Sequence, residues 1–89
     1  MVILKMTDLN KIPQNHRTAL IMIYEEYLDA EKKHKPFNSP HEAYAIIQEE
    51  LEECWHLIKN DEKAWAGRDA MKYEIKAVGA MALRFILDL

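Results

Sequence analysis

The sequence predicts an all-α protein that folds as one domain. The chain of 89 residues holds only two glycines and three prolines, too few for the tight turns of a β-sheet, and it is rich in residues that favour helices. Its apolar residues recur every three or four positions, as they do on one face of a helix. A chain of this length supports one small core, so we expect a single domain over residues 1–89.

The first predicted helix covers residues 13–33. Pro13 suits a first helical turn, because the N–H group that proline lacks has no helical partner there. Apolar side chains then repeat at spacings of three and four. The preceding lead, residues 1–12, fits either a short strand or a poorly ordered segment.

The second predicted helix covers residues 40–59. The stretch HKPFNSPHE breaks the first helix, because a residue before proline is pushed out of helical geometry. Ser39 and Glu42 have the spacing of a capping box, and Pro40 suits the first helical position. These signals place the start of the helix directly after Ser39.

The third predicted helix covers residues 68–88. Asn60 and Asp61 interrupt the second helix, and EKAWAG is expected to form a short turn that ends at Gly67. The third helix is apolar around most of its circumference, more than the other helices of one chain can cover. We therefore expect a homodimer or homotetramer that resembles a four-helix bundle.

Charge, hydropathy and cysteine content argue against several classes of protein. The net charge of -3 and the scattered cationic residues give no basic face for duplex nucleic acid. No segment approaches the ~20 uninterrupted apolar residues of a membrane span, and we do not expect the amino terminus to direct export. The one cysteine, Cys54, rules out an internal disulfide and suits a core position. We expect a soluble, cytoplasmic protein.

Two predicted helices place glutamates among their apolar residues. At about 100° per residue, Glu50 falls within the apolar stripe of the second helix, and Glu49 and Glu53 fall at its edge. Glu74 lies in the middle of the apolar stripe of the third helix. A buried carboxylate without compensation is so unfavourable that it must be protonated, paired or metal-bound. We therefore expect Glu50, Glu53 and Glu74 to converge on a site for Mg²⁺ or Mn²⁺.

Other charged residues are expected to face solvent. Arg84 and Lys76 lie on the side of the third helix away from Glu74. Glu31 shares the apolar face of the first helix but lies near its end, where solvent is the expected partner. Glutamates at the edge of an apolar stripe also commonly extend to solvent or pair with lysines.

The glutamates carry a resemblance to a known family. The run EELEE at residues 49–53 resembles the EExxE motif of MazG-like all-α nucleotide pyrophosphohydrolases, and Glu74 follows at a spacing that this family allows before its second motif, ExxD. The likeness is best over residues 36–89. It implies a dimeric or tetrameric, Mg²⁺-dependent enzyme that hydrolyses nucleoside triphosphates to monophosphate and pyrophosphate. The catalytic and metal-binding candidates are Glu49, Glu50, Glu53 and Glu74, of which Glu49 could instead be the base.

One position departs from the family pattern. The aspartate of ExxD would stand at position 77, where this sequence has Ala77. The glutamates could still hold one metal ion, because Mg²⁺ keeps part of its water shell. A non-catalytic helical dimer of the same ancestry, acting as a binding or interaction module, is therefore the alternative hypothesis.

Cationic and aromatic side chains are the candidates for substrate binding. Ammonium groups bind phosphate oxygens, and a tryptophan can stack on a base. Helical lysines are more often solvated, and tryptophans at helical spacing more often lie in a core or an interface. The candidates are Lys32, Lys35, Lys59, Lys76, Trp55 and Trp65.

Overall fold

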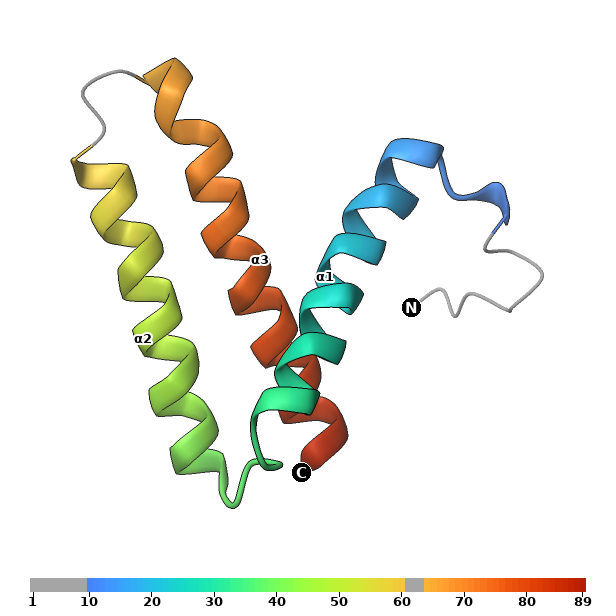
Figure 1. Ribbon diagram of the computed structural model, residues 1–89, viewed down its shortest axis with the longest axis vertical. Helices are drawn as coiled ribbons and strands as arrows, with labels where there is room; N and C mark the ends of the chain where they lie inside the picture. Colours follow the sequence, from blue (N-terminus) through green and yellow to red (C-terminus); the bar gives the residue numbers. More distant parts are fainter. Residues whose placement is uncertain (1–9, 61–63) are drawn as a thin grey trace.

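Three helices make up the computed structural model, which describes residues 10–60 and 64–89 (Figure 1). They are α1 (Gln14–Lys33), α2 (Pro40–Lys59) and α3 (Ala64–Asp88). No strand occurs within these described ranges, which confirms the prediction of an all-α chain. Most of the lead at residues 1–12 and the side chain of Trp65 lie outside the described part, so the expectations for them stay predictions.

The start of α2 follows the signals in the sequence. Ser39 is the N-cap, and its side-chain oxygen accepts a hydrogen bond from the backbone N–H of Glu42 at 3.1 Å. The reciprocal half of the capping box is displaced by one residue. The Glu42 carboxylate accepts from the backbone N–H of Asn38 at 3.4 Å and from its side-chain amide at 3.3 Å.

The start of α3 corrects a prediction. The helix begins at Ala64, so the four residues up to Gly67 are helical and do not form the expected turn. A glycine that ends a helix adopts a positive φ, and no described glycine has one. Within a helix, glycine costs only about 1 kcal/mol relative to alanine, and Gly67 is tolerated there.

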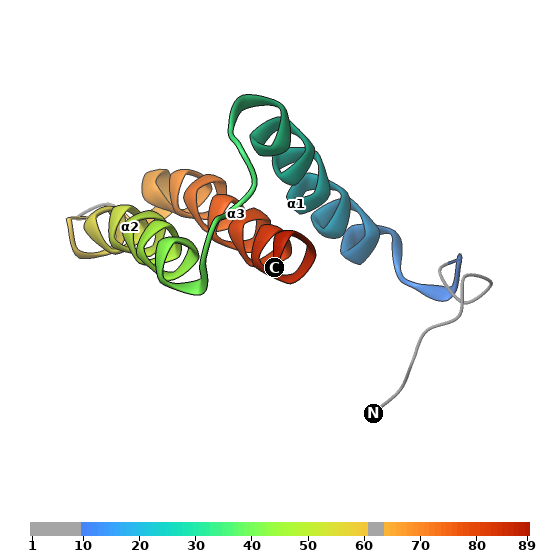
Figure 2. The ribbon, with the colours of Figure 1, turned by 90° about the horizontal axis from the view of Figure 1, so that it is seen from below.

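The helix α3 lies between the other two. In the end-on view, α2, α3 and α1 follow one another across the molecule (Figure 2). Both α1 and α2 pack against α3, and over the described residues they do not pack against each other. Gly79 allows the close approach of α1, because a Cβ at this position would lie 3.2 Å from the side chain of Ile23.

The core is small and lies where the α1–α2 loop, residues 34–39, meets the C-terminal half of α3. Its buried apolar residues are Ala30, Phe37, Ala43, Ala80 and Met81, with Tyr27, Ile46 and Ile47 packed against them. Cys54 is buried between α2 and α3, with its Sγ 3.8 Å from the Met71 carbonyl oxygen, which confirms it as a core thiol.

One side of the α2–α3 pair remains apolar and open to solvent. Six large side chains on this side are between 45% and 70% exposed: Tyr44, Leu51, Trp55, Ile58, Ile75 and Ile86. On a helical wheel, the four from α2 lie about 180° from Glu49 and Glu53. The two from α3 lie about 170° from Arg84. We call these six residues the outer face. None of the helices in the described ranges has the length and apolarity of a membrane span.

Candidate functional site

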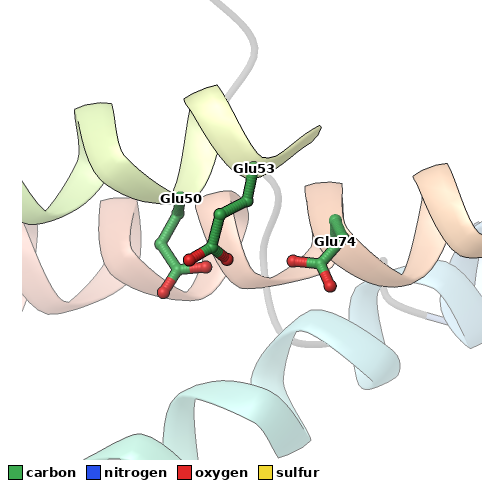
Figure 3. Close-up of side chains that lie close together, drawn as sticks. All are labelled: Glu50, Glu53 and Glu74. Atoms are coloured by element: carbon green, nitrogen blue, oxygen red, sulfur yellow. The ribbon is translucent and has the colours of Figure 1, made fainter. Parts of the chain in front are cut away.

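Three glutamates converge between α2 and α3. Glu50 and Glu53 extend from consecutive turns of α2, and Glu74 extends from the neighbouring turn of α3, with the carboxylates directed toward one another (Figure 3). One oxygen from each carboxylate lies within 4.8 Å of the others. Glu50 and Glu74 are half-buried, and Glu53 is exposed. The convergence expected from the helical wheels is therefore present, and we call these three residues the glutamate cluster.

No cation among the described residues pairs with the glutamate cluster. Burial raises the pKa of the Glu50 carboxyl, and the charges of Glu53, Glu74, Glu49 and Glu26 raise it further. Of the ion pairs between described residues, none joins a lysine or arginine to a member of the cluster. The repulsion can be relieved by a proton on Glu50 or by a bound cation.

A groove of about 470 Å³ adjoins the glutamate cluster at Glu50. The C-terminal halves of α1 and α3, the α1–α2 loop and the part of α2 from Glu42 to Glu50 enclose it. Charges of both signs line the groove. The carboxylates are Glu26, Asp29, Glu42, Glu49 and Glu50, and the cations are Lys33, Lys35 and Arg84.

Glu49, a predicted metal ligand, and Ala77, the position that departs from the family pattern, also line the groove. Glu49 is exposed, and no oxygen of Glu49 belongs to the set that lies within 4.8 Å. Ala77 is half-buried and presents only a methyl group to the groove. The structure thus separates Glu49 from the three convergent glutamates and places Ala77 beside the same groove.

The predicted substrate-binding residues divide between the groove and the surface. Lys35 is exposed and lines the groove. Lys76 does not line the groove, and its side chain is only 17% exposed, so the expectation that it faces solvent is wrong. Its Nζ lies 3.6 Å from Glu26, which lines the groove, and 4.1 Å from the centre of the Tyr73 ring. The other described candidates are exposed and do not line the groove: Lys32, Lys59 and Trp55.

Sequence reasoning did not single out the pair of Asp29 and Lys33, which lines the groove. The Nζ of Lys33 lies 2.9 Å from Asp29 Oδ2. This hydrogen bond lowers the pKa of Asp29 and raises that of Lys33, each mainly through its partner. The spacing of four residues on one helix was the signal that could have identified the pair.

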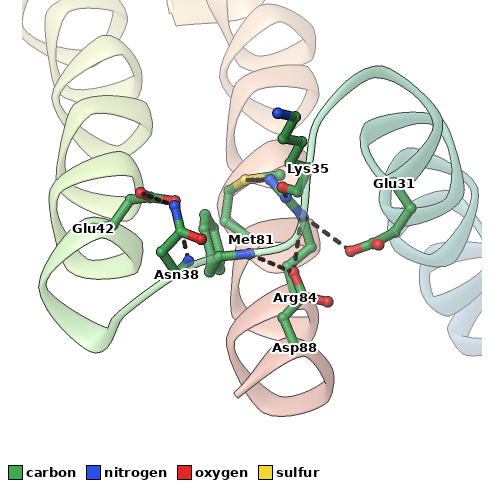
Figure 4. Close-up of polar contacts among 8 residues, drawn as sticks. Glu31, Lys35, Asn38, Glu42, Met81, Arg84 and Asp88 are labelled. Atoms are coloured by element: carbon green, nitrogen blue, oxygen red, sulfur yellow. Dashed lines mark hydrogen bonds and ion pairs between the residues drawn. The ribbon is translucent and has the colours of Figure 1, made fainter.

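A second charged cluster corrects two predictions. Arg84 was expected on the side of its helix away from Glu74, but it lies only about 80° from Glu74 on a helical wheel and is only 3% exposed. Its Nε donates to Glu31 Oε1 at 3.1 Å and lies 3.6 Å from Asp88 Oδ2 (Figure 4). The expectation that solvent is the partner of Glu31 is therefore wrong. Because α1 packs against this side of α3, it covers Arg84 and brings Glu31 to it. We call Glu31, Arg84 and Asp88 the arginine cluster.

Comparisons of the chain with protein-family models, curated proteins and solved structures return no match. The site is therefore interpreted from its own geometry and chemistry.

Proposed function

We propose that the protein is a metal-dependent hydrolase that cleaves nucleoside triphosphates to monophosphate and pyrophosphate. The single observation that supports this proposal best is the approach of three carboxylates to within 4.8 Å of one another beside a groove. The EExxE pattern at residues 49–53, followed by Glu74, agrees with the same activity.

The donor set suits a hard divalent cation. Around Mg²⁺, with metal–oxygen distances of about 2.1 Å, neighbouring ligand oxygens lie about 3.0 Å apart and opposite ones about 4.2 Å apart. The three carboxylates, at up to 4.8 Å, need only small rotations to reach this spacing. Waters would complete the octahedron, and the exposure of Glu53 leaves the cluster open to them.

Each residue of the site has a role in this proposal. Glu50, Glu53 and Glu74 hold the cation, which when bound neutralises charge on the phosphate oxygens and acidifies a coordinated water. Glu49 lines the groove one turn before Glu53, and its free carboxylate is placed to accept a proton from the attacking water. Lys35, on the loop side of the groove, offers an ammonium group to the outer phosphates.

The test is release of pyrophosphate from a panel of nucleoside triphosphates, with Mg²⁺, with Mn²⁺ and with a chelator. We expect metal-dependent turnover that Glu50→Gln and Glu74→Gln abolish. Glu52→Gln is the matched control, because Glu52 lies in the same run but is exposed and outside the cluster. Absence of turnover across the panel in the presence of either metal would overturn the proposed activity.

We also propose that the protein acts as a homodimer assembled through the outer face. Large apolar side chains grouped on one exposed face are typical of protein–protein interfaces. Two copies joined there would form a four-helix bundle, and each chain would keep its own glutamate cluster. We expect a dimer in sedimentation at micromolar concentration, Trp55→Glu to shift it toward monomer, and His56→Glu, at the neighbouring exposed position, to leave it intact.

Ala77 favours a second candidate, a non-catalytic helical dimer that binds a ligand or a partner. A methyl group stands where the resembling family supplies a carboxylate oxygen, so one ligand of a catalytic centre is missing. Metal and nucleotide binding by calorimetry, measured beside turnover, separates the two. Binding without turnover would select the module.

A further inference from the structure

The loop between α1 and α2 is held in place by side chains from the end of α3. Arg84 Nη2 donates to the backbone carbonyl of Lys35 at 2.6 Å, and the backbone N–H of Phe37 donates to Asp88 Oδ2 at 3.2 Å. The Phe37 ring covers the guanidinium, with its centre 4.2 Å from Arg84 Cζ. The loop is thus attached to α3 at two backbone positions and one side chain (Figure 4).

Arg84 joins three segments through one rigid group. Its Nε binds Glu31 on α1, its Nη2 binds the loop at Lys35, and its Nη1 lies 3.8 Å from Met81 Sδ on α3. A guanidinium is planar and presents its donors in a fixed fork, so these contacts determine one orientation of the loop relative to both helices. Lysine, with one terminal nitrogen, does not reproduce this arrangement.

The same loop forms one side of the groove. Its residues from His34 to Asn38 line the groove together with Glu49 and Glu50 of α2. Asn38 and Ser39 attach the end of the loop to the first turn of α2 through Glu42. Because α1 and α2 do not pack against each other over the described residues, the contacts with α3 hold the rest of the loop, at Lys35 and Phe37, beside α2. We propose that Arg84 is a positioning residue that holds the loop side of the groove in register with the glutamate cluster. The part of this proposal that concerns nucleotide binding rests on the proposed function.

The first arm of the experiment measures the loop itself. In Arg84→Lys, we expect amide exchange of Phe37 to accelerate by at least about 10-fold, since hydrogen bonds and ring stacking on the guanidinium are lost. The amides of Cys54 and Ala80 should keep their wild-type rates, because α2 and α3 still pack together. Arg17→Lys, at an exposed position on α1, is the matched control and should change none of these rates.

A second variant protects the test against misfolding. The combined substitution Glu31→Gln and Arg84→Met removes one charge of each sign and the bond to the Lys35 carbonyl, and it keeps Asp88, whose carboxylate accepts from the Phe37 N–H. We expect it to fold and to show the same acceleration at Phe37. Exchange at Phe37 that stays at the wild-type rate in a folded variant, or that rises only together with Cys54 and Ala80, would overturn the proposal.

The second arm asks whether the held loop matters for a ligand. Calorimetry would compare Mn²⁺ alone with an α,β-imido nucleoside triphosphate in the presence of Mn²⁺. In Arg84→Lys we expect nucleotide affinity to fall by about 10-fold, which corresponds to about 1.4 kcal/mol, with Mn²⁺ affinity unchanged. A parallel loss of both affinities would assign Arg84 a general structural role and overturn the positioning role. If the wild type binds Mn²⁺ and no nucleotide, the proposed function fails, while the exchange arm still decides whether Arg84 holds the loop.

Discussion

The helix α3 contributes to two charged clusters, of which one pairs opposite charges and the other brings like charges together. Glu74 of the glutamate cluster and Arg84 of the arginine cluster are ten positions apart on α3, or about 15 Å along the helix axis. In the arginine cluster, one cation donates hydrogen bonds to the Glu31 carboxylate and the Lys35 carbonyl and forms an ion pair with Asp88 at 3.6 Å. In the glutamate cluster, three like charges meet with no ion-pair partner among the described residues.

The two clusters differ in whether other described residues compensate their charge. The buried charge of Arg84 is matched from three segments, so the arginine cluster is complete within the chain and stabilises the loop. In the glutamate cluster, burial and then the neighbouring carboxylates raise the pKa of Glu50, and no lysine or arginine of the described residues forms an ion pair with the cluster. Removing a charge from the arginine cluster should therefore destabilise the fold, whereas removing one from the glutamate cluster should reduce the repulsion there.

The largest expected effect is on the arginine cluster. Arg84→Met should lower the free energy of unfolding by about 3–5 kcal/mol, because it leaves two carboxylates unpaired in a buried setting. Urea denaturation followed by circular dichroism would measure it. Restoring neutrality with Glu31→Gln and Asp88→Asn in the same chain should recover part of the loss. A cost below about 1 kcal/mol, typical of a surface pair, would mean that the arginine cluster is not a structural unit.

The next effect concerns the glutamate cluster and its expected cation. A ligand that binds only the folded state at 100 times its Kd stabilises it by about 2.7 kcal/mol. For a chain of this size, each kcal/mol raises the melting temperature by about 4–8 °C. We expect Mg²⁺ or Mn²⁺ to raise the wild-type Tm in thermal melts, and Glu50→Gln to lose this increment. Glu52→Gln should keep it. A wild-type Tm indifferent to millimolar metal would count against the metal site.

The bounds of a helix were predictable where residues at its own ends mark them. The bounds of α2 follow from Ser39 and Pro40 at one end and Asn60 at the other, and the structure places the helix at residues 40–59 as predicted. The start of α3 was missed because Gly67 is compatible both with a helix end and with a helix interior. The φ angle of Gly67 distinguishes a helix end from a helix interior, and the sequence alone does not determine this angle.

The two clusters were predictable to different degrees for a physical reason. A helical wheel gives the direction of each side chain, so two neighbouring helices with inward glutamates were enough to predict that Glu50, Glu53 and Glu74 converge. The environment of Arg84 depends on a third helix that covers a side of α3 which looks polar by itself. The spacing of four residues between Arg84 and Asp88 was the one local signal of the second cluster.

A smaller effect is expected from an added ligand. On α3, position 77 lies about 60° from Glu74 and one turn along, and Ala77 already faces the groove. Ala77→Asp should tighten Mn²⁺ binding by about 10-fold, the lower end of the range that changes around metal sites produce. Ala82→Asp, at an exposed position on α3, is the matched control. If the two variants bind Mn²⁺ equally, the glutamate cluster does not extend toward position 77. Turnover that rises with Ala77→Asp would favour the enzyme over the binding module.

The smallest effect, and the one that isolates the protein without metal, is the pH dependence conferred by Glu50. Its pKa is raised in the folded protein, first by burial and then by the neighbouring carboxylates. Between the ordinary and the raised pKa the folded state binds more protons than the unfolded state, so stability falls as pH rises through this window and is level above it. Below the ordinary pKa both states are protonated, and the contribution vanishes. In the presence of a chelator, Glu50→Gln should therefore match the wild type in acid and exceed it at neutral pH.

The size of this difference should stay under about 1 kcal/mol, because solvent screens a partly exposed carboxyl. Urea denaturation at pH values from 3.5 to about 8 would record the difference between variant and wild type. Glu52→Gln, outside the cluster, should give a difference that does not grow with pH. If the Glu50→Gln variant instead loses stability relative to the wild type as pH rises, the pH dependence has the opposite sign to the one expected. It would mean that the folded chain favours the charged form of Glu50 without metal. Both clusters would then stabilise their charged groups, and the contrast between them would fail.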